Sequence, residues 1–411
     1  MRVRPLGGDR RDEVRLHRFL HNPEVTPQEM VASAREHTKR RVAGRHVLAI
    51  QDTTSLRDDG KTLSLQLHPT IAVDAADGTM LGLVEAAFLR HDGAAKPHRN
   101  KRDLESKESR RWRDGTCQAG ELLEAGASGV TVIADREADI YETFACRPTG
   151  VDLLIRVRHD RRLAGGGRLF ACTERLAELG REVVDLPAAP GRRARRATLA
   201  LRACRVEIPR PQRPLTEETA QLPRSVNLWL VEAKEVDPPP NGEPLHWLLL
   251  TTHEVTTLAD ATRVTGYYRQ RWHIEQVFRV MKTKGFDIEA VPLRNKRSQR
   301  NLACATLIAA IQVQQMLHDR DGQANRPMSD VFAPEDQPLI ESIGKSLEGK
   351  TERQKNPHPS GSLAHAGWIC ARLGGWTGYG GKPGPIVLVR GLVRLQTMLE
   401  GIKRCEHVCI S

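Results

Sequence analysis

Four polar side chains recur at helical spacing in the second half of the chain: Tyr268, Arg271, Glu275 and Lys282. At about 100° per residue they fall within roughly 60° of arc, so one helix face would carry a carboxylate flanked by two cations and a phenol. A carboxylate can hold a divalent cation, and Arg and Lys nearby suit phosphate oxygens bridged to that cation. The stripe therefore indicates phosphoryl transfer. The alternative is a solvated face with an exposed Arg271–Glu275 pair, worth only about 0.3 to 0.5 kcal/mol.

The opposite side of this predicted helix is apolar. It carries Tyr267, Ile274, Val277, Phe278 and Met281. Such a face docks on a hydrophobic core and leaves the polar stripe pointing outward or into a cleft.

Two aspartates follow predicted strands. Residues 46–51 have the pattern of a short strand that ends before Asp52, and residues 130–134 have that of a buried strand that ends before Asp135. In mixed α/β sheets, ligand-binding groups collect at the carboxyl ends of strands, because the backbone there is rigid and loops open above it. The alternative for each aspartate is a turn former or a helix cap.

Taken together, these motifs resemble the DDE transposases of the bacterial insertion sequence 4 family, and most closely the branch of the transposon-five cut-and-paste transposase. The resemblance is carried by Gln-Asp-Thr-Thr at Asp52, by Ala-Asp-Arg-Glu-Ala-Asp-Ile-Tyr at Asp135, and by Tyr-x2-Arg-x3-Glu-x6-Lys around Glu275. It covers nearly the whole chain, including residues 105–109, 247–251 and 374–379.

The resemblance implies that Asp52, Asp135 and Glu275 are the catalytic and metal-binding residues. Together they would hold two Mg²⁺ ions, or Mn²⁺ as a substitute, about 3.5 to 4 Å apart. One ion would activate water or a 3′ hydroxyl, and the other would stabilise the leaving oxygen. The implied activity is cut-and-paste transposition, with nicking at the element end, a hairpin step and strand transfer to target DNA.

The resemblance also implies DNA contacts. Tyr268, Arg271 and Lys282 match positions that grip DNA next to the scissile phosphate, where an Arg fork can contact two phosphate oxygens. Trp247 matches a Trp that stacks on a base swung out of the duplex, and core packing is its alternative. Arg156 resembles a DNA-contacting Arg of the family.

A run of arginines lies farther along the chain, at Arg192, Arg193, Arg195 and Arg196. Such a run is more often a solvated face than a binding site, although tracking a DNA backbone is the functional alternative.

The expected fold is α/β: a ribonuclease-H-like, retroviral-integrase-like mixed sheet with helices, interrupted by an all-β insertion and followed by a helical C-terminal region. Asp135 and Glu275 stand 140 residues apart, too far for a simple loop, which favours the insertion. The expected parts are a remnant of an N-terminal helical DNA-binding domain (1–45), the first part of the catalytic core (46–157), the β-rich insertion (158–250), the second part of the core (251–300), and a C-terminal dimerisation region (301–411). For the terminal helix, packing on the same chain is the alternative to pairing two subunits.

Composition agrees with a nucleic-acid partner. The chain has 63 basic and 51 acidic residues, a net charge of +12 and a pI near 9.5. Such a balance favours a polyanion, here double-stranded DNA. The sequence has no run of 18 apolar residues and no apolar signal core, which predicts a cytoplasmic protein.

Eight cysteines without a Cys-x-x-Cys pair indicate reduced thiols. Cys405, His407 and Cys409 have the composition of half a zinc site, but no second pair lies nearby, and the site is not favoured.

Three hypotheses remain open. The first is a metal-dependent transposase, N-terminally truncated because the first catalytic aspartate comes early in the chain. The second is a regulator that inhibits the full-length enzyme by forming mixed dimers. The third, a carboxylate-based hydrolase such as a glycosidase, needs only two acids and leaves the basic charge and the stripe unexplained.

Overall fold

The computed structural model describes residues 10–57, 63–89, 110–174, 176–186, 194–212, 217–240, 243–291, 293 and 295–409. The strands are β1 His46–Gln51, β2 Thr54–Arg57, β3 Leu63–Asp74, β4 Met80–Leu89, β5 Gly129–Ala134, β6 Val151–Arg156, β7 Gly180–Leu186, β8 Arg195–Pro209, β9 Ser225–Val236 and β10 His246–Thr251. The α-helices are α1 Arg10–His21, α2 Pro27–Lys39, α3 Arg110–Glu124, α4 Tyr141–Ala145, α5 Leu169–Thr173, α6 Glu217–Ala220, α7 Leu258–Arg269, α8 Trp272–Lys282, α9 Lys296–His318, α10 Gln337–Leu347, α11 Leu363–Leu373 and α12 Pro385–Cys409. Short 3₁₀ turns include η3 Arg136–Ala138, η4 Ile288–Ala290 and η5 Met328–Asp330.

The strands form one mixed sheet, which confirms the α/β class. Within the described residues it has ten strands in the order β2-β3-β1-β5-β6-β10-β9-β8-β7, with β4 paired to β3. β1, β5 and β6 are parallel neighbours, and the other pairs are antiparallel. The three parallel strands therefore send their carboxyl ends to the same edge.

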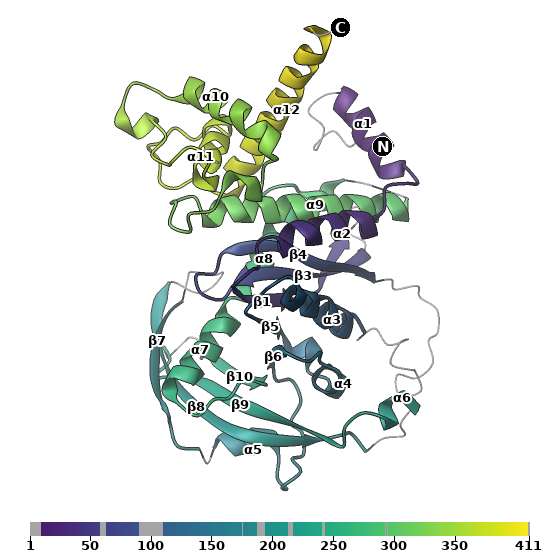
Figure 1. The fold of residues 1–411 in the computed structure, drawn as a ribbon. Helices are drawn as coiled ribbons and strands as arrows, with labels where there is room; N and C mark the ends of the chain where they lie inside the picture. Colours follow the sequence, from purple (N-terminus) through teal and green to yellow (C-terminus); the bar gives the residue numbers. More distant parts are fainter. Residues whose placement is uncertain are drawn as a thin grey trace.

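Helices cover both faces of this sheet because the inner strands are apolar on both sides. Leu48 and Ile50 of β1 pack in a core with residues of α7, α8 and α9. Val47 and Ala49 point to the opposite face and pack in a second core with residues of α3 and α4. Figure 1 shows α3 and α4 beside the central strands and α9 lying across the upper part of the sheet.

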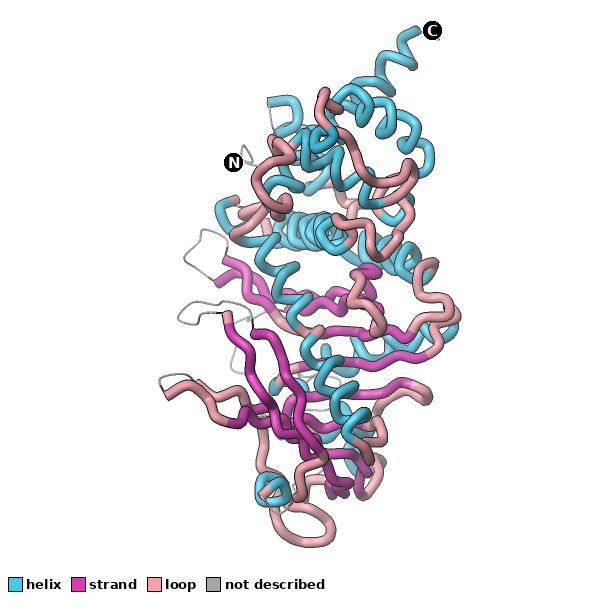
Figure 2. The backbone as a smooth tube through the Cα atoms, turned by 90° about the vertical axis from the view of Figure 1, so that its left-hand side faces the viewer, coloured by secondary structure: helices cyan, strands magenta, loops and turns pink. Residues whose placement is uncertain are grey.

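The strands expected in an insertion continue the same sheet. β9 pairs with β10 and β10 pairs with β6, so β7, β8 and β9 extend the catalytic sheet beyond its parallel part. In Figure 2 the strands lie one beneath another, and the helical C-terminal part lies at the top. The proposed domain boundaries, the insertion at 158–250 among them, remain predictions.

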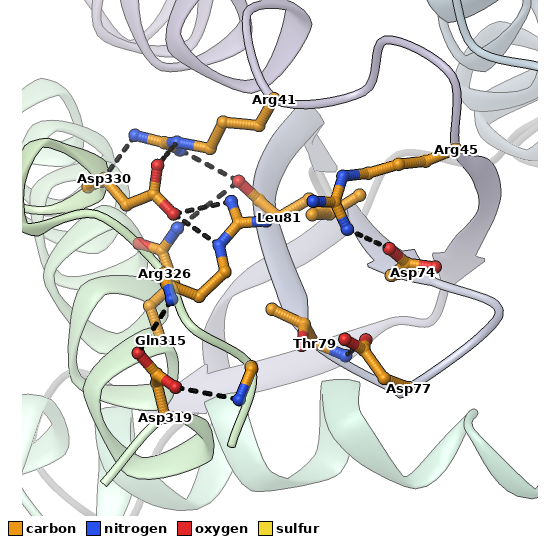
Figure 3. Close-up of polar contacts among 11 residues, drawn as sticks. Arg41, Arg45, Asp74, Asp77, Thr79, Leu81, Gln315, Asp319, Arg326 and Asp330 are labelled. Carbon is orange, nitrogen blue, oxygen red and sulfur yellow. Dashed lines mark hydrogen bonds and ion pairs between the residues drawn. The ribbon is translucent and has the colours of Figure 1, made fainter. Parts of the chain in front are cut away.

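A buried polar network joins the N-terminal segment, the sheet and the C-terminal region (Figure 3). The Arg41 guanidinium donates to the carboxylate of Asp330 at 3.2 Å and to the carbonyl of Leu81 on β4 at 2.8 Å. The Nε of Arg326 donates to the same carboxylate at 2.6 Å, and its backbone N–H donates to Asp319 at 3.2 Å. The two guanidiniums thus share one buried acid at the junction between α2, β4 and η5.

The cysteines that the structure describes are all reduced, as their spacing predicted. Cys117, Cys146, Cys172, Cys204, Cys304 and Cys370 are free thiols. The side chains of Cys405, His407 and Cys409 lie outside the described part. No helix that the structure describes is long and apolar enough to cross a membrane.

Candidate active site

The carboxyl ends of β1, β5 and β6 bring three candidate side chains, Asp52, Asp135 and Arg156, to one edge of the sheet. The parallel register of β1 with β5, continued past the strand ends, places Asp52 beside Asp135. The register of β5 with β6, continued by one residue, places Asp135 beside Arg156. Asp135 is the residue that precedes the η3 turn, but its carboxylate makes no capping hydrogen bond to that turn, so capping does not occupy the side chain.

The stripe that carries Glu275 lies on two helices, and the prediction of one continuous helix is wrong. Between α7 and α8, the backbone N–H of Arg271 donates to the Tyr268 carbonyl at 3.1 Å, a three-residue bond that interrupts the α-helical ladder. Gln270 and Arg271 keep right-handed helical angles, with φ of −65° and −52°. The backbone therefore forms one tight turn between α7 and α8 but does not reverse its direction. Residues of both helices contribute to the same site.

The apolar face of α8 fixes the direction of Glu275. Ile274, Val277 and Met281 are completely buried and Phe278 nearly so, as the spacing predicted. Tyr267 of the predicted apolar face is only half-buried, whereas Tyr268 of the polar stripe is buried. Because the apolar side chains of α8 pack on the sheet, rotation of α8 about its axis would expose them to water. The orientation of the carboxylate is thus set by burial.

Arg271 connects two of the acids. Its Nη1 donates to the Oδ2 of Asp52 at 2.9 Å, and its Nη2 donates to the Oε1 of Glu275 in a very short contact. The guanidinium side chain is only 15% exposed. One buried cation thus lies between an acid from the end of β1 and an acid from α8, 223 residues apart in the sequence.

Asp135 occupies the other side of the site. The hydroxyl of Tyr268 donates to Asp135 Oδ1 at 3.3 Å, and Nη1 of Arg156 lies 3.9 Å from the same oxygen. The ring of Trp247 packs edge-on against Tyr268, with centroids 5.5 Å apart and an angle of 66° between planes. Tyr268 and Arg156 therefore lie next to the second acid, and Trp247 packs on Tyr268.

Charges within the site perturb one another. Burial raises the pKa of Asp52 above its ordinary value, and the nearby charges of Asp135 and Glu275 raise it further, while Arg271 opposes the shift. Burial also raises the pKa of Tyr268 to about 12, again with a contribution from Asp135. Burial alone would lower the pKa of Arg271, but the charges of Tyr268, Asp52, Glu275 and Asp135 outweigh it and raise that pKa. The three acids therefore lie close enough to interact electrostatically.

Lys282 lies apart from the acids. Its ammonium donates to the carbonyl of Ser55 at 2.6 Å and lies 3.6 Å from Glu289 of η4. It thus holds the chain segment that follows Asp52, at the edge of the site.

Other basic candidates lie away from this centre. Arg195 forms an ion pair with Glu235, and Arg196 lies 3.2 Å from Asp185 on the surface. Arg192, Arg193 and the motif residues 105–109 are outside the described residues.

A divalent metal fits the chemistry of this donor set, but not the positions of its side chains in the described structure. Carboxylate oxygens are the ligands that Mg²⁺ and Mn²⁺ prefer. Within the described ranges, however, no three His, Cys, Asp or Glu side chains lie close enough together to hold a metal ion. The carboxylates of Asp52 and Glu275 are turned to Arg271 instead. Metal binding by the trio therefore requires Arg271 to exchange its contacts.

Sequence reasoning missed a residue that connects the two aspartate loops. Arg111, at the start of α3, forms an ion pair with Glu137 at 2.8 Å and donates to the Thr53 hydroxyl oxygen at 3.3 Å. Thr53 follows Asp52, and Glu137 lies two residues after Asp135. A basic residue at the start of a helix carries no local signal for this role, because both partners are distant in sequence.

Comparison with protein families identifies the same region of the chain. Residues 34–311 match the family model described as a transposase DDE domain. The match includes the strands that end at Asp52 and Asp135 and the helix that carries Glu275.

Proposed function

Because this chain belongs to the DDE transposase family, we propose that it cuts and joins DNA by metal-dependent phosphoryl transfer at Asp52, Asp135 and Glu275. The observation that carries the proposal is the position of Arg271, which contacts Asp52 and Glu275 and interacts electrostatically with Asp135. Arg271 thus contacts one acid from a strand end and one acid from a helix, and the charge of Asp135 contributes to its raised pKa. A solvated helix face would not bury that cation between two acids from distant parts of the chain.

The carboxylates of Asp52, Asp135 and Glu275 would hold Mg²⁺, or Mn²⁺ in its place, as two ions. Metal bound there would activate water or a 3′ hydroxyl and stabilise the leaving oxygen. The guanidinium of Arg271, once released from the two carboxylates, is suited to bind two oxygens of the scissile phosphate. Tyr268, Arg156 and Lys282 would contact DNA around it, and the net charge of +12 favours association with the duplex.

The finer assignment is the insertion sequence 4 family and its cut-and-paste branch, supported by the Tyr-x2-Arg-x3-Glu-x6-Lys signature. In this assignment Trp247 stacks on a base displaced from the duplex during a hairpin step. Its half-buried ring next to Tyr268 supports that role, because the hydroxyl of Tyr268 contacts Asp135. The enzyme would act as a homodimer, for which α12 offers the exposed Val393 and Met398.

The test is Mg²⁺-dependent nicking of a duplex that contains the inverted repeat flanking the gene. Asp52→Ala, Asp135→Ala and Glu275→Ala should each reduce nicking by more than about 100-fold. Binding to the uncut duplex should stay measurable, because each variant leaves the basic residues in place.

Asp185→Ala is the matched control, since Asp185 is an exposed acid far from the site in sequence. It should nick at the wild-type rate. Near-normal nicking by any one of the three variants would remove that residue from the catalytic set.

A further inference from the structure

Thr53 lies next to the first acid of the site. Its backbone N–H donates to Asp52 Oδ1 at 2.8 Å. Its hydroxyl oxygen lies 2.9 Å from Nδ1 of His68 and 3.3 Å from Nε of Arg111. The side chain is half-buried, whereas His68 is completely buried beneath it. The direction of each hydrogen bond decides what the hydroxyl group can still bind.

The buried neighbours of His68 determine which of its ring nitrogens carries hydrogen. The Gln51 carboxamide has two orientations. In one, its oxygen lies 3.2 Å from His68 Nε2 and its nitrogen lies 3.3 Å from the Thr116 hydroxyl, but the oxygen then also faces the Trp112 carbonyl and the nitrogen faces the Thr116 backbone N–H. Only the opposite orientation pairs a donor with an acceptor at each of these backbone contacts. In that orientation its nitrogen donates to His68 Nε2 at 3.2 Å and to the Trp112 carbonyl at 3.3 Å, and its oxygen accepts from the Thr116 backbone at 3.1 Å. Because Nε2 of His68 accepts, the hydrogen of the neutral ring is on Nδ1. His68 therefore donates to Thr53.

The charge state of His68 does not alter this direction. Burial and the charge of Arg111 lower the pKa of His68 well below its ordinary value, so the ring is neutral. A protonated ring would also carry hydrogen on Nδ1. In both states the hydroxyl oxygen of Thr53 is the acceptor.

Both lone pairs of the Thr53 hydroxyl are thus occupied, one by His68 and the other by Arg111, which has only donors. Within the described chain no acceptor takes the hydroxyl hydrogen. It belongs to a half-buried group beside Asp52, in a segment where Arg111 contacts Thr53 and Arg271 contacts Asp52. A donor in such surroundings suits an anionic oxygen that arrives from outside.

We propose that the Thr53 hydroxyl donates a hydrogen bond to a non-bridging phosphate oxygen of the DNA strand bound at the site. The inference rests on the proposed function and adds a substrate-binding residue to it. His68 and Gln51 are positioning residues, because they aim the hydroxyl and do not touch DNA. Arg111 also orients the Thr53 hydroxyl, and its ion pair with Glu137 connects Thr53 to the loop that follows Asp135.

The experiment first removes the Thr53 hydroxyl by substitution, and then removes the charge of single DNA phosphates by chemical modification. Binding of the end-containing duplex is measured by fluorescence anisotropy in Ca²⁺, so that no cleavage is needed. Thr53→Val should weaken binding about tenfold, in the range expected for a hydrogen bond to a charged group. Thr53→Ser should bind like the wild type. Thr54→Val, the same change at a buried neighbour on β2, should also leave affinity unchanged.

Duplexes with a single methylphosphonate, placed in turn at each phosphate around the cleavage point, locate the contact. At one position the wild type should lose affinity and Thr53→Val should not, so that the two proteins bind equally there. Thr53→Ala replaces Thr53→Val if circular dichroism shows that the valine variant does not fold.

The outcomes separate the two proposals. If the wild type neither nicks nor prefers the end-containing duplex over a scrambled one, the proposed function fails and the Thr53 role fails with it. If the wild type nicks but Thr53→Val has the wild-type methylphosphonate profile at every position, only the Thr53 role is overturned. Equal losses for Thr53→Ser and Thr53→Val would overturn it as well.

Discussion

Replacing Asp330 with Asn tests the buried junction between the sheet and the C-terminal region. Asp330 is 8% exposed and faces the guanidiniums of Arg41 and Arg326, whose side chains are 12% and 6% exposed. Asn preserves the shape of the side chain and keeps one carbonyl acceptor, but it removes the charge that compensates both cations. The substitution therefore isolates the electrostatic part of the junction.

The expected cost follows from burial. Removing one partner of a buried ion pair leaves an uncompensated charge and typically costs 3 to 5 kcal/mol. Because Asn still accepts one hydrogen bond, we expect the lower end, about 3 kcal/mol. For a cooperative unit of 150 to 250 residues, each kcal/mol lowers Tm by about 2 to 4 °C, so Tm should fall by about 6 to 12 °C.

Differential scanning calorimetry measures this change, and Asp185→Asn supplies the matched control. Asp185 and its partner Arg196 are 83% and 79% exposed, so the same substitution there should cost less than about 0.5 kcal/mol. Hydrogen exchange should show the loss of protection in Asp330→Asn at α2 and η5. A difference of less than about 1 °C between the Tm values of Asp330→Asn and Asp185→Asn would be no larger than the effect of an exposed ion pair. That result would show that the charge of Asp330 does not stabilise the junction.

Three further perturbations address helix packing, metal binding and the aromatic pair. A Cβ at Gly391 would lie 1.6 Å from a backbone carbonyl of α11, so Gly391→Ala should cost at least about 3 kcal/mol, whereas Gly401→Ala, in open space, should not destabilise in thermal melts. Burial raises the pKa of Asp52, and only the ionised carboxylate binds metal. As the pH is lowered, the Mn²⁺ affinity measured by calorimetry should therefore begin to fall at a higher pH than it would for a carboxylate with an ordinary pKa. Arg271→Gln removes the opposing charge and should move that fall to still higher pH; an unchanged or lower midpoint would contradict the assignment. Trp247→Ala should impair hairpin formation more than first nicking, with Trp247→Phe closer to wild type, and equal loss of both steps would count against base stacking.

The sequence predicted the parts of the site that depend on local pattern. Asp52 and Asp135 each follow an apolar strand, and parallel pairing then places them side by side. The apolar face of α8 was predicted from spacing alone, and its residues are buried. Strand ends and amphipathic faces are local properties, so they can be recognised before the fold is known.

The sequence did not predict features that depend on distant partners. The break between α7 and α8 occurs at Gln270 and Arg271, neither of which is a Gly or Pro helix breaker. The pairing of β10 with both β6 and β9, which merges the expected insertion into the sheet, is set by long-range register. The hydrogen bonds from Arg111 to Thr53 and between Thr53 and His68 connect α3, the loop after β1, and β3. No local periodicity in the sequence predicts them.

The three acids reach the site by different routes. Asp52 and Asp135 are placed side by side by the hydrogen-bonded ladder of β1 and β5, whereas Glu275 lies on α8, which packs on the sheet through its apolar face. During synthesis on the ribosome, the last acid emerges 140 residues after the second. A nascent or truncated polypeptide that ends before α8 would thus carry only two of the three proposed metal ligands. Such a product is expected to leave chromosomal DNA intact until the whole core has been made.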